Sequence, residues 1–137
     1  MTQPDGSDRP LLDKDVLDRL REEVEDDRGV WRVFVQAFIA QLPRRAERLR
    51  LTLTTGDGAG AVDAVLSLKT SCQMVGAERL AELAGNLERS LRQDTQCGDP
   101  GVVLPWLAVA YLGQIRQCSE KTANLLTNYL QERPGSL

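Results

Sequence analysis

Apolar residues recur every three or four positions along most of this chain, and this spacing is the feature that most constrains its fold. It places one apolar stripe along each of several long segments, as amphipathic α-helices require. No segment shows the apolar and polar alternation, bounded by turn dipeptides, that predicts a β-strand. No internal repeat with a period of roughly 20 to 50 residues is visible. We therefore expect an all-α protein.

Breaks rich in glycine, proline and aspartate divide the periodic region into five expected helices. They cover Leu12 to Val24; the region after the N-cap candidates Asp26 and Asp27, up to the break at Thr55; Ala59 to Val75; Ala77 to Arg92; and the region from Pro100 to about Gln131. Residues Gln93 to Pro100 form the expected last loop, in which Asp99 caps the helix that follows. Long amphipathic helices with short connections close most economically as an antiparallel four-helix bundle, and the short first helix covers one end.

Each expected helix presents one apolar stripe to the bundle core. In chain order the stripes are Leu12, Val16, Leu20 and Val24; Trp31, Phe34, Phe38, Leu42, Leu49 and Leu53; Ala61, Ala64, Val65, Leu68, Cys72 and Val75; Leu80, Leu83, Ala84, Leu87 and Leu91; and Leu104, Leu107, Tyr111, Ile115, Cys118, Leu125 and Tyr129. Trp31 and Trp106 are expected in the core or at the rim of the bundle. Leu66 falls opposite the stripe of the third helix and is predicted to point at solvent.

The last helix also carries apolar residues in excess of its stripe, and they are Val102, Val103, Trp106 and Ala110. An apolar excess of this kind suits a face for self-association. A monomer and a weak homodimer are therefore both open.

Composition and charge limit the possible partners. The 17 lysines and arginines against 20 acidic residues give a formal charge of -3, which leaves no excess positive charge for nucleic acid or an anionic membrane. No apolar run approaches membrane-spanning length, and the N-terminus lacks the pattern of a signal peptide. We expect a cytoplasmic protein with one domain over residues 11–132, between a disordered lead at 1–10 and a flexible tail at 133–137.

The chain contains no histidine, which excludes several kinds of chemistry. Ser-His and Cys-His nucleophiles, imidazole metal ligands and phosphohistidine are all ruled out. The three cysteines, Cys72, Cys97 and Cys118, form no Cys-x-x-Cys pair that would indicate a metal site, and their number suits a reducing compartment. We expect no catalytic residue, no metal and no cofactor, so the sequence does not indicate an enzyme.

The stretch from Leu66 to Ala77 reads Leu-Ser-Leu-Lys-Thr-Ser-Cys-Gln-Met-Val-Gly-Ala. It resembles the signature of histidine-containing phosphotransfer (HPt) domains, which runs His-x-Leu-Lys-Gly and continues through a serine-rich step to Gly-Ala. The matching residues are Leu68, Lys69, Ser71, Gly76 and Ala77, and the similarity extends over about residues 12–131 through Phe38, Leu42-Pro43, Gly56-Asp57, Leu80-Ala81 and Leu87-Glu88. The resemblance implies a four-helix bundle that relays phosphoryl groups between sensor kinases and receiver domains in two-component signalling.

The sequence departs from the signature at the positions that would carry out phosphotransfer. Leu66 stands where the resemblance places the phosphorylatable histidine, and Thr70 stands where the family has a glycine. Phosphoryl relay needs a nucleophilic nitrogen that can also leave, whereas an isobutyl group has no lone pair. A phosphoester on Ser67 or Ser71 would be too stable for reversible transfer.

We interpret the chain as a phosphorylation-incompetent HPt-like domain that works by protein–protein binding, as an adaptor or competitor at a receiver domain or sensor kinase. The candidate partner-binding residues share one helix face and are Val62, Leu66, Lys69, Thr70 and Gln73. For Lys69, the resemblance implies a role in balancing the charge of a phosphoryl group. Two alternatives stay open: an active phosphotransfer domain that carries an engineered His-to-Leu change, and a structural or dimerising bundle with no phosphorelay role.

Overall fold

The computed structural model describes residues 9–23 and 30–132, apart from the side chains of Glu23, Cys97 and Glu132. These residues form five helices and no strand, which confirms the all-α prediction. The helices are α1 (Lys14–Glu23), α2 (Val30–Thr54), α3 (Gly58–Met74), α4 (Glu78–Cys97) and α5 (Pro100–Glu132). The N-cap candidates Asp26 and Asp27, the stripe residue Val24, residues 1–8 and the segment 133–137 lie outside the described residues.

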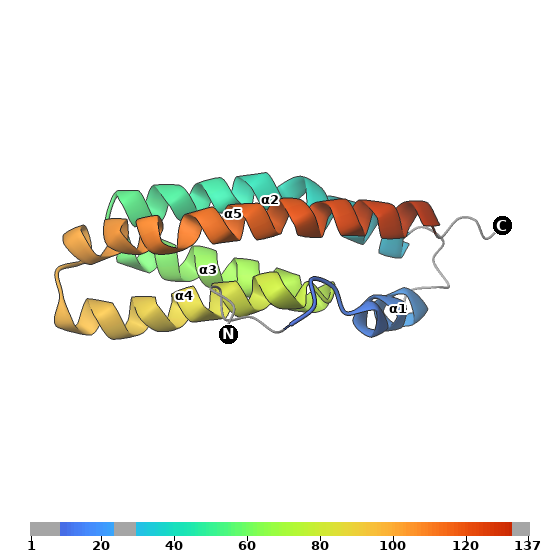
Figure 1. Ribbon diagram of the computed structural model, residues 1–137, viewed down its shortest axis with the longest axis horizontal. Coiled ribbons are helices and arrows are strands. Elements are labelled where there is room, and N and C mark those ends of the chain that lie inside the picture. The colour runs from blue at the N-terminus through green and yellow to red at the C-terminus, as the bar shows by residue number, and fades with distance from the viewer. Residues whose placement is uncertain (1–8, 24–29, 133–137) are drawn as a thin grey trace, which may run out of the picture.

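The four long helices form an antiparallel bundle, as the sequence predicts (Figure 1). Helix α2 packs against α3 and α5, and α4 packs against the same two helices, so α3 and α5 lie diagonally opposite each other. The short α1 covers one end of the bundle. The contacts that hold it there include two hydrogen bonds: the Asp13 N–H donates to the Gly76 carbonyl at 2.7 Å, and the Tyr129 hydroxyl donates to Asp18 at 2.6 Å.

Short turns with capping groups connect the bundle helices. The Asp57 side chain accepts the Gly60 N–H at 3.0 Å at the start of α3, and Asp99 accepts the Gly101 N–H at 3.0 Å at the start of α5, which confirms the Asp99 N-cap. Gly76 has a φ of 75° in the turn between α3 and α4, and a Cβ there would lie 2.6 Å from the Asp13 carbonyl oxygen. This position therefore requires glycine, both for its backbone conformation and for the close approach of the chain before α1.

The predicted core is largely confirmed. The predicted stripe residues of the third and fourth helices are all buried. They are Ala61, Ala64, Val65, Leu68, Cys72, Val75, Leu80, Leu83, Ala84, Leu87 and Leu91. On α2 the buried residues are Trp31, Val35, Phe38, Leu42, Leu49 and Leu53, while Phe34 is partly buried. Trp31 packs edge-on against Tyr129 with ring centroids 5.9 Å apart, so its prediction as a core or rim residue is correct.

The predicted stripe of α5 is wrong at one position. Leu125 is 39% exposed, whereas its neighbour Leu126 is fully buried. The buried face of α5 continues through Thr122, Leu126 and Leu130, and Leu125 lies at its edge. Polar Thr122 belongs to this face, so a reading based on apolar residues alone chose Leu125 instead of Leu126.

Three further expectations are corrected. Helix α4 continues to Cys97, so the predicted loop from Gln93 is helical over most of its length. Trp106 is 69% exposed and belongs neither to the core nor to a packed rim. Helix α1 starts at Lys14 rather than Leu12 because Asp13 accepts the Asp15 N–H at 3.0 Å, and its fully buried residue is Leu17.

Candidate partner-binding site on α3

The five candidate residues of α3 lie along one side of the helix, between α2 and α4. Thr70 and Gln73 are exposed, whereas Val62, Leu66 and Lys69 are partly buried. Leu66 is therefore not fully solvent-facing, which corrects the prediction that it points at solvent. The cause is that α3 has a neighbour on each flank, so side chains of α2 and α4 cover part of this face.

On the α4 flank, Lys69 is held in an ion pair. Its Nζ donates to Glu88 Oε1 at 2.7 Å, and Arg92 donates to the other carboxylate oxygen of Glu88 at 3.0 Å. The hydrogen bond from Lys69 is the main reason why the pKa of the Glu88 carboxyl is below its usual value. The charge of Lys69 is thus balanced inside the protein by a carboxylate.

On the α2 flank, two arginines reach across to α3. Arg48 donates to the Asp63 carboxylate at 2.7 Å. Arg45 donates to the Ser67 hydroxyl through a short hydrogen bond, and to Gln41 of its own helix at 2.9 Å. Residues on both sides of Leu66 in sequence are therefore tied to the neighbouring helices.

The rim of this face is more cationic than the chain as a whole. The four contacts given above join four cationic side chains, Arg45, Arg48, Lys69 and Arg92, to two carboxylates, Asp63 and Glu88, and to the neutral Ser67. The whole chain carries a formal charge of -3. Positive charge is thus concentrated around Leu66, and an acidic partner surface would be favoured there.

Sequence reasoning missed most of this rim. In the two ion pairs, Arg48 lies 15 positions from Asp63 and Lys69 lies 19 positions from Glu88, so no local spacing pairs them. An indirect signal existed, because Leu87-Glu88 was among the residues that carried the family resemblance. The role of Glu88 as the partner of Lys69 depends on how α3 packs against α4.

The described residues show no group of three histidine, cysteine, aspartate or glutamate side chains that could hold a metal ion. Cys72 is buried in the core, and burial raises the pKa of its thiol far above the usual value. It is therefore a packed core thiol, and its burial confirms its place in the predicted stripe. None of the helices in residues 9–23 and 30–132 has the length and apolar character that a membrane span requires.

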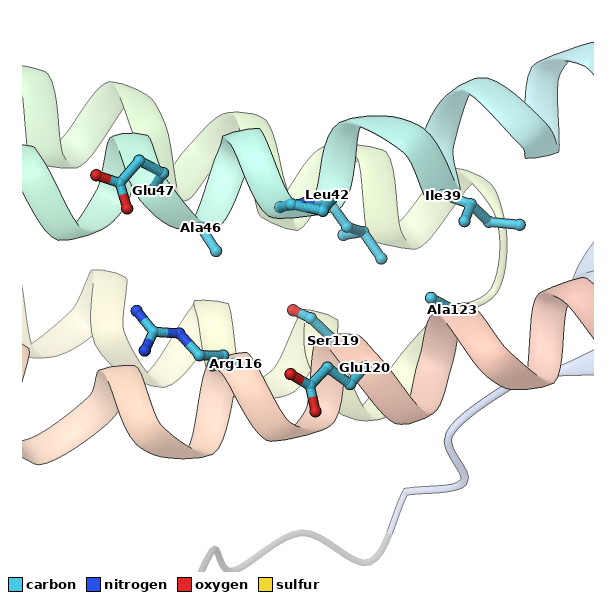
Figure 2. Close-up of a pocket in the computed structure, with 9 residues that line it drawn as sticks. Ile39, Leu42, Ala46, Glu47, Arg116, Ser119, Glu120 and Ala123 are labelled. Atoms are coloured by element: carbon cyan, nitrogen blue, oxygen red, sulfur yellow. The ribbon is translucent and has the colours of Figure 1, made fainter.

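A separate hollow of about 450 Å³ lies between α2 and α5 (Figure 2). Its walls are Ile39, Leu42, Pro43, Ala46, Glu47, Arg116, Ser119, Glu120 and Ala123. Ser119 is buried, and its hydroxyl has no hydrogen-bond partner among the described residues. The charged groups of the walls have both signs, so the hollow indicates no particular ligand class, and none of its residues belongs to α3.

Comparison with known proteins identifies the bundle. The Hpt domain family matches residues 33–132, which include almost all of α2 and the whole of α3, α4 and α5. The chain belongs to the Hpt domain family. A similar solved structure is histidine-containing phosphotransfer protein B (HptB) from Pseudomonas aeruginosa PAO1, with a TM-score of 0.72 and 25% sequence identity over 90% of this chain and 96% of that chain. No curated protein matches the sequence.

Membership of the Hpt family places the chain among the helical-bundle proteins of two-component phosphorelays. Hpt domains carry phosphoryl groups between signalling proteins and interact with receiver domains and kinases. The expected fold and family are thereby confirmed.

Proposed function

We propose that this Hpt domain cannot be phosphorylated and acts by binding a protein of a two-component pathway, as an adaptor or competitor at a receiver domain or sensor kinase. The observation that carries the proposal is the absence of histidine from all 137 residues, together with Leu66 at the start of the family signature. Carbon has no lone pair with which to attack phosphorus, so Leu66 cannot accept a phosphoryl group. On this view the protein is a binding module and not an enzyme.

The neighbouring side chains of α3 offer no substitute nucleophile. The Ser67 hydroxyl is engaged by Arg45, and its phosphoester would be too stable for reversible transfer. The Lys69 Nζ is held in an ion pair with Glu88 at 2.7 Å, so it is not presented as a nucleophile on this face. Cys72 faces the core, and its raised pKa keeps it a thiol.

The same face is suited to binding. Covering the exposed part of Leu66 would contribute at most about 1 kcal/mol, so charge around it must supply much of the specificity. The cationic rim formed by Arg45, Arg48, Lys69 and Arg92 favours a partner that presents acidic groups around an apolar spot. Such signalling partners act in the cytoplasm, and we propose the same location for this chain.

The leucine also limits how a receiver can dock. The family resemblance implies that a receiver accepts the histidine in an acidic, metal-binding pocket. Pressing Leu66 into such a pocket would desolvate carboxylates without a hydrogen bond, at a cost of about 1 to 3 kcal/mol for each unpaired group. We therefore propose either a pose displaced towards α2 and α3 or a partner whose pocket is less acidic.

Titration of receiver domains against this chain tests the proposal. Leu66→Asp should weaken binding at least tenfold, or about 1.4 kcal/mol, because it places a carboxylate at the centre of the contact. Leu125→Asp is the matched control, since Leu125 is a partly exposed leucine on α5, diagonally opposite α3. The proposal fails if both variants bind as tightly as the unaltered chain, or if the leucine form binds an acidic-pocket receiver in the family pose more tightly than Leu66→His does.

A further inference from the structure

The first third of α5 carries an exposed apolar patch, formed by Val102, Trp106 and Val109. These are the three most exposed large apolar side chains among the described residues, at 65%, 69% and 76%. Their spacing of four and three positions places them on one stripe of the helix. Single exposed apolar residues are common, but a contiguous cluster around a tryptophan is typical of an interaction surface.

A hollow of about 480 Å³ adjoins this patch, and Trp106 forms one of its walls. The other lining residues are Asp94, Gly98, Val103, Leu107 and Ala110. Three of these side chains are apolar, while Asp94 supplies the one carboxylate. Gly98 keeps the end of the hollow open, because a Cβ there would lie 2.7 Å from a methyl carbon of Val103.

We propose that this surface pairs with a second copy of the same chain, with Trp106 of each copy inserted in the hollow of the other. The protrusion and the hollow lie side by side on one face, as a two-fold contact requires, so the pair closes instead of growing into a filament. A buried indole N–H needs an acceptor, and the exposed Asp94 carboxylate at the hollow provides one. Tryptophan in a pocket is also a frequent centre of binding energy in protein interfaces.

The dimer should be weak and should leave the α3 face free. A stable interface buries roughly 800 Å² on each partner, which is more than one helix stripe and one hollow offer. Helix α5 contacts α2 and α4 and lies diagonally opposite α3 in the bundle. The dimer is therefore independent of the proposed function, and either can fail without the other.

Sedimentation equilibrium over a concentration series tests this pairing. The unaltered chain should approach twice the monomer mass as its concentration rises. Trp106→Ala removes the protrusion and Ala110→Arg fills the hollow, so each variant should weaken dimerisation at least tenfold. Val33→Arg is the matched control because Val33 is an equally exposed residue on α2, and it should leave dimerisation unchanged.

Sedimentation equilibrium of a mixture of the two variants gives the most specific test of the pairing. Trp106→Ala keeps the five other lining residues of the hollow, and Ala110→Arg keeps its tryptophan, so one of the two contacts can still form in the mixed pair. The mixture should dimerise more tightly than either variant alone. The proposal is overturned if the unaltered chain stays monomeric up to about 1 mM, if Trp106→Ala dimerises as the unaltered chain does, or if the mixture shows no recovery.

Discussion

Truncating two leucines of α3 that are two positions apart tests whether Leu66 is available to a partner. Leu68 is 1% exposed, and Leu→Ala removes three carbons from it, or about 2.4 kcal/mol of transfer free energy at ~0.8 kcal/mol for each carbon. The closed cavity adds to this, so Leu68→Ala should lower the free energy of unfolding by about 3 to 5 kcal/mol. Leu66 is partly exposed, and solvent fills the space that it leaves. Leu66→Ala should therefore cost only about 1 to 1.5 kcal/mol.

Urea unfolding followed by circular dichroism measures the free energy of unfolding of both variants. Both are Leu→Ala substitutions on the same helix, so the change in helix propensity is the same in each. The m-value should be unchanged in both variants, so that the shift in midpoint reports stability alone. If Leu66→Ala proves as destabilising as Leu68→Ala, Leu66 is a core residue, and the binding face assigned to it does not exist.

Other perturbations test the packing and the electrostatics. On α5, Leu126→Ala should destabilise by about 2 to 5 kcal/mol and Leu125→Ala by less than ~1, and the reverse order in thermal melts would contradict the burial of Leu126 and the exposure of Leu125. Because the pKa of the Glu88 carboxyl is lowered, its ion pairs stabilise the fold at neutral pH and lose this effect as the pH falls through the lowered value. The difference in unfolding free energy between the unaltered chain and Glu88→Gln should therefore be constant above about pH 5 and vanish in stronger acid. A difference that grows towards low pH would refute this sign. Gly76→Ala should cost at least about 1 to 3 kcal/mol because its positive φ and the nearby Asp13 carbonyl exclude a Cβ, and a neutral effect in chemical unfolding would contradict that geometry.

The sequence predicted the fold well where apolar spacing alone decides the structure. On α3 and α4 the period of 3.6 residues identified every stripe residue that the structure buries, because an unbroken apolar stripe runs along the buried side of each helix. The longer α5 was predicted less well at Leu125, since its buried face passes through polar Thr122 and continues to Leu126. Trp106 was misplaced because composition favours a buried tryptophan, whereas its exposure depends on which surfaces the other helices leave uncovered.

The candidate site could be predicted only in part. The signature around Leu66 and Lys69 was visible in the sequence, and the Hpt family match supports it. The cross-helix pairs of Lys69 with Glu88 and of Arg48 with Asp63 depend on how α3 packs between its neighbours, which no local pattern encodes. The ion pair of Lys69 in particular changes its expected role, because a cation already balanced by Glu88 is less available to a phosphoryl group.

Phosphoryl transfer to the unaltered chain tests the central claim most directly. The chain is incubated with a phosphorylated receiver domain or an active hybrid kinase, and a histidine-containing Hpt domain such as HptB serves as the positive control. We expect the control to acquire phosphate that is labile in acid and stable in alkali, and the chain with Leu66 to acquire none, because its 137 residues include no histidine. Stoichiometric labelling of this chain with acid-labile, alkali-stable phosphate would contradict the account.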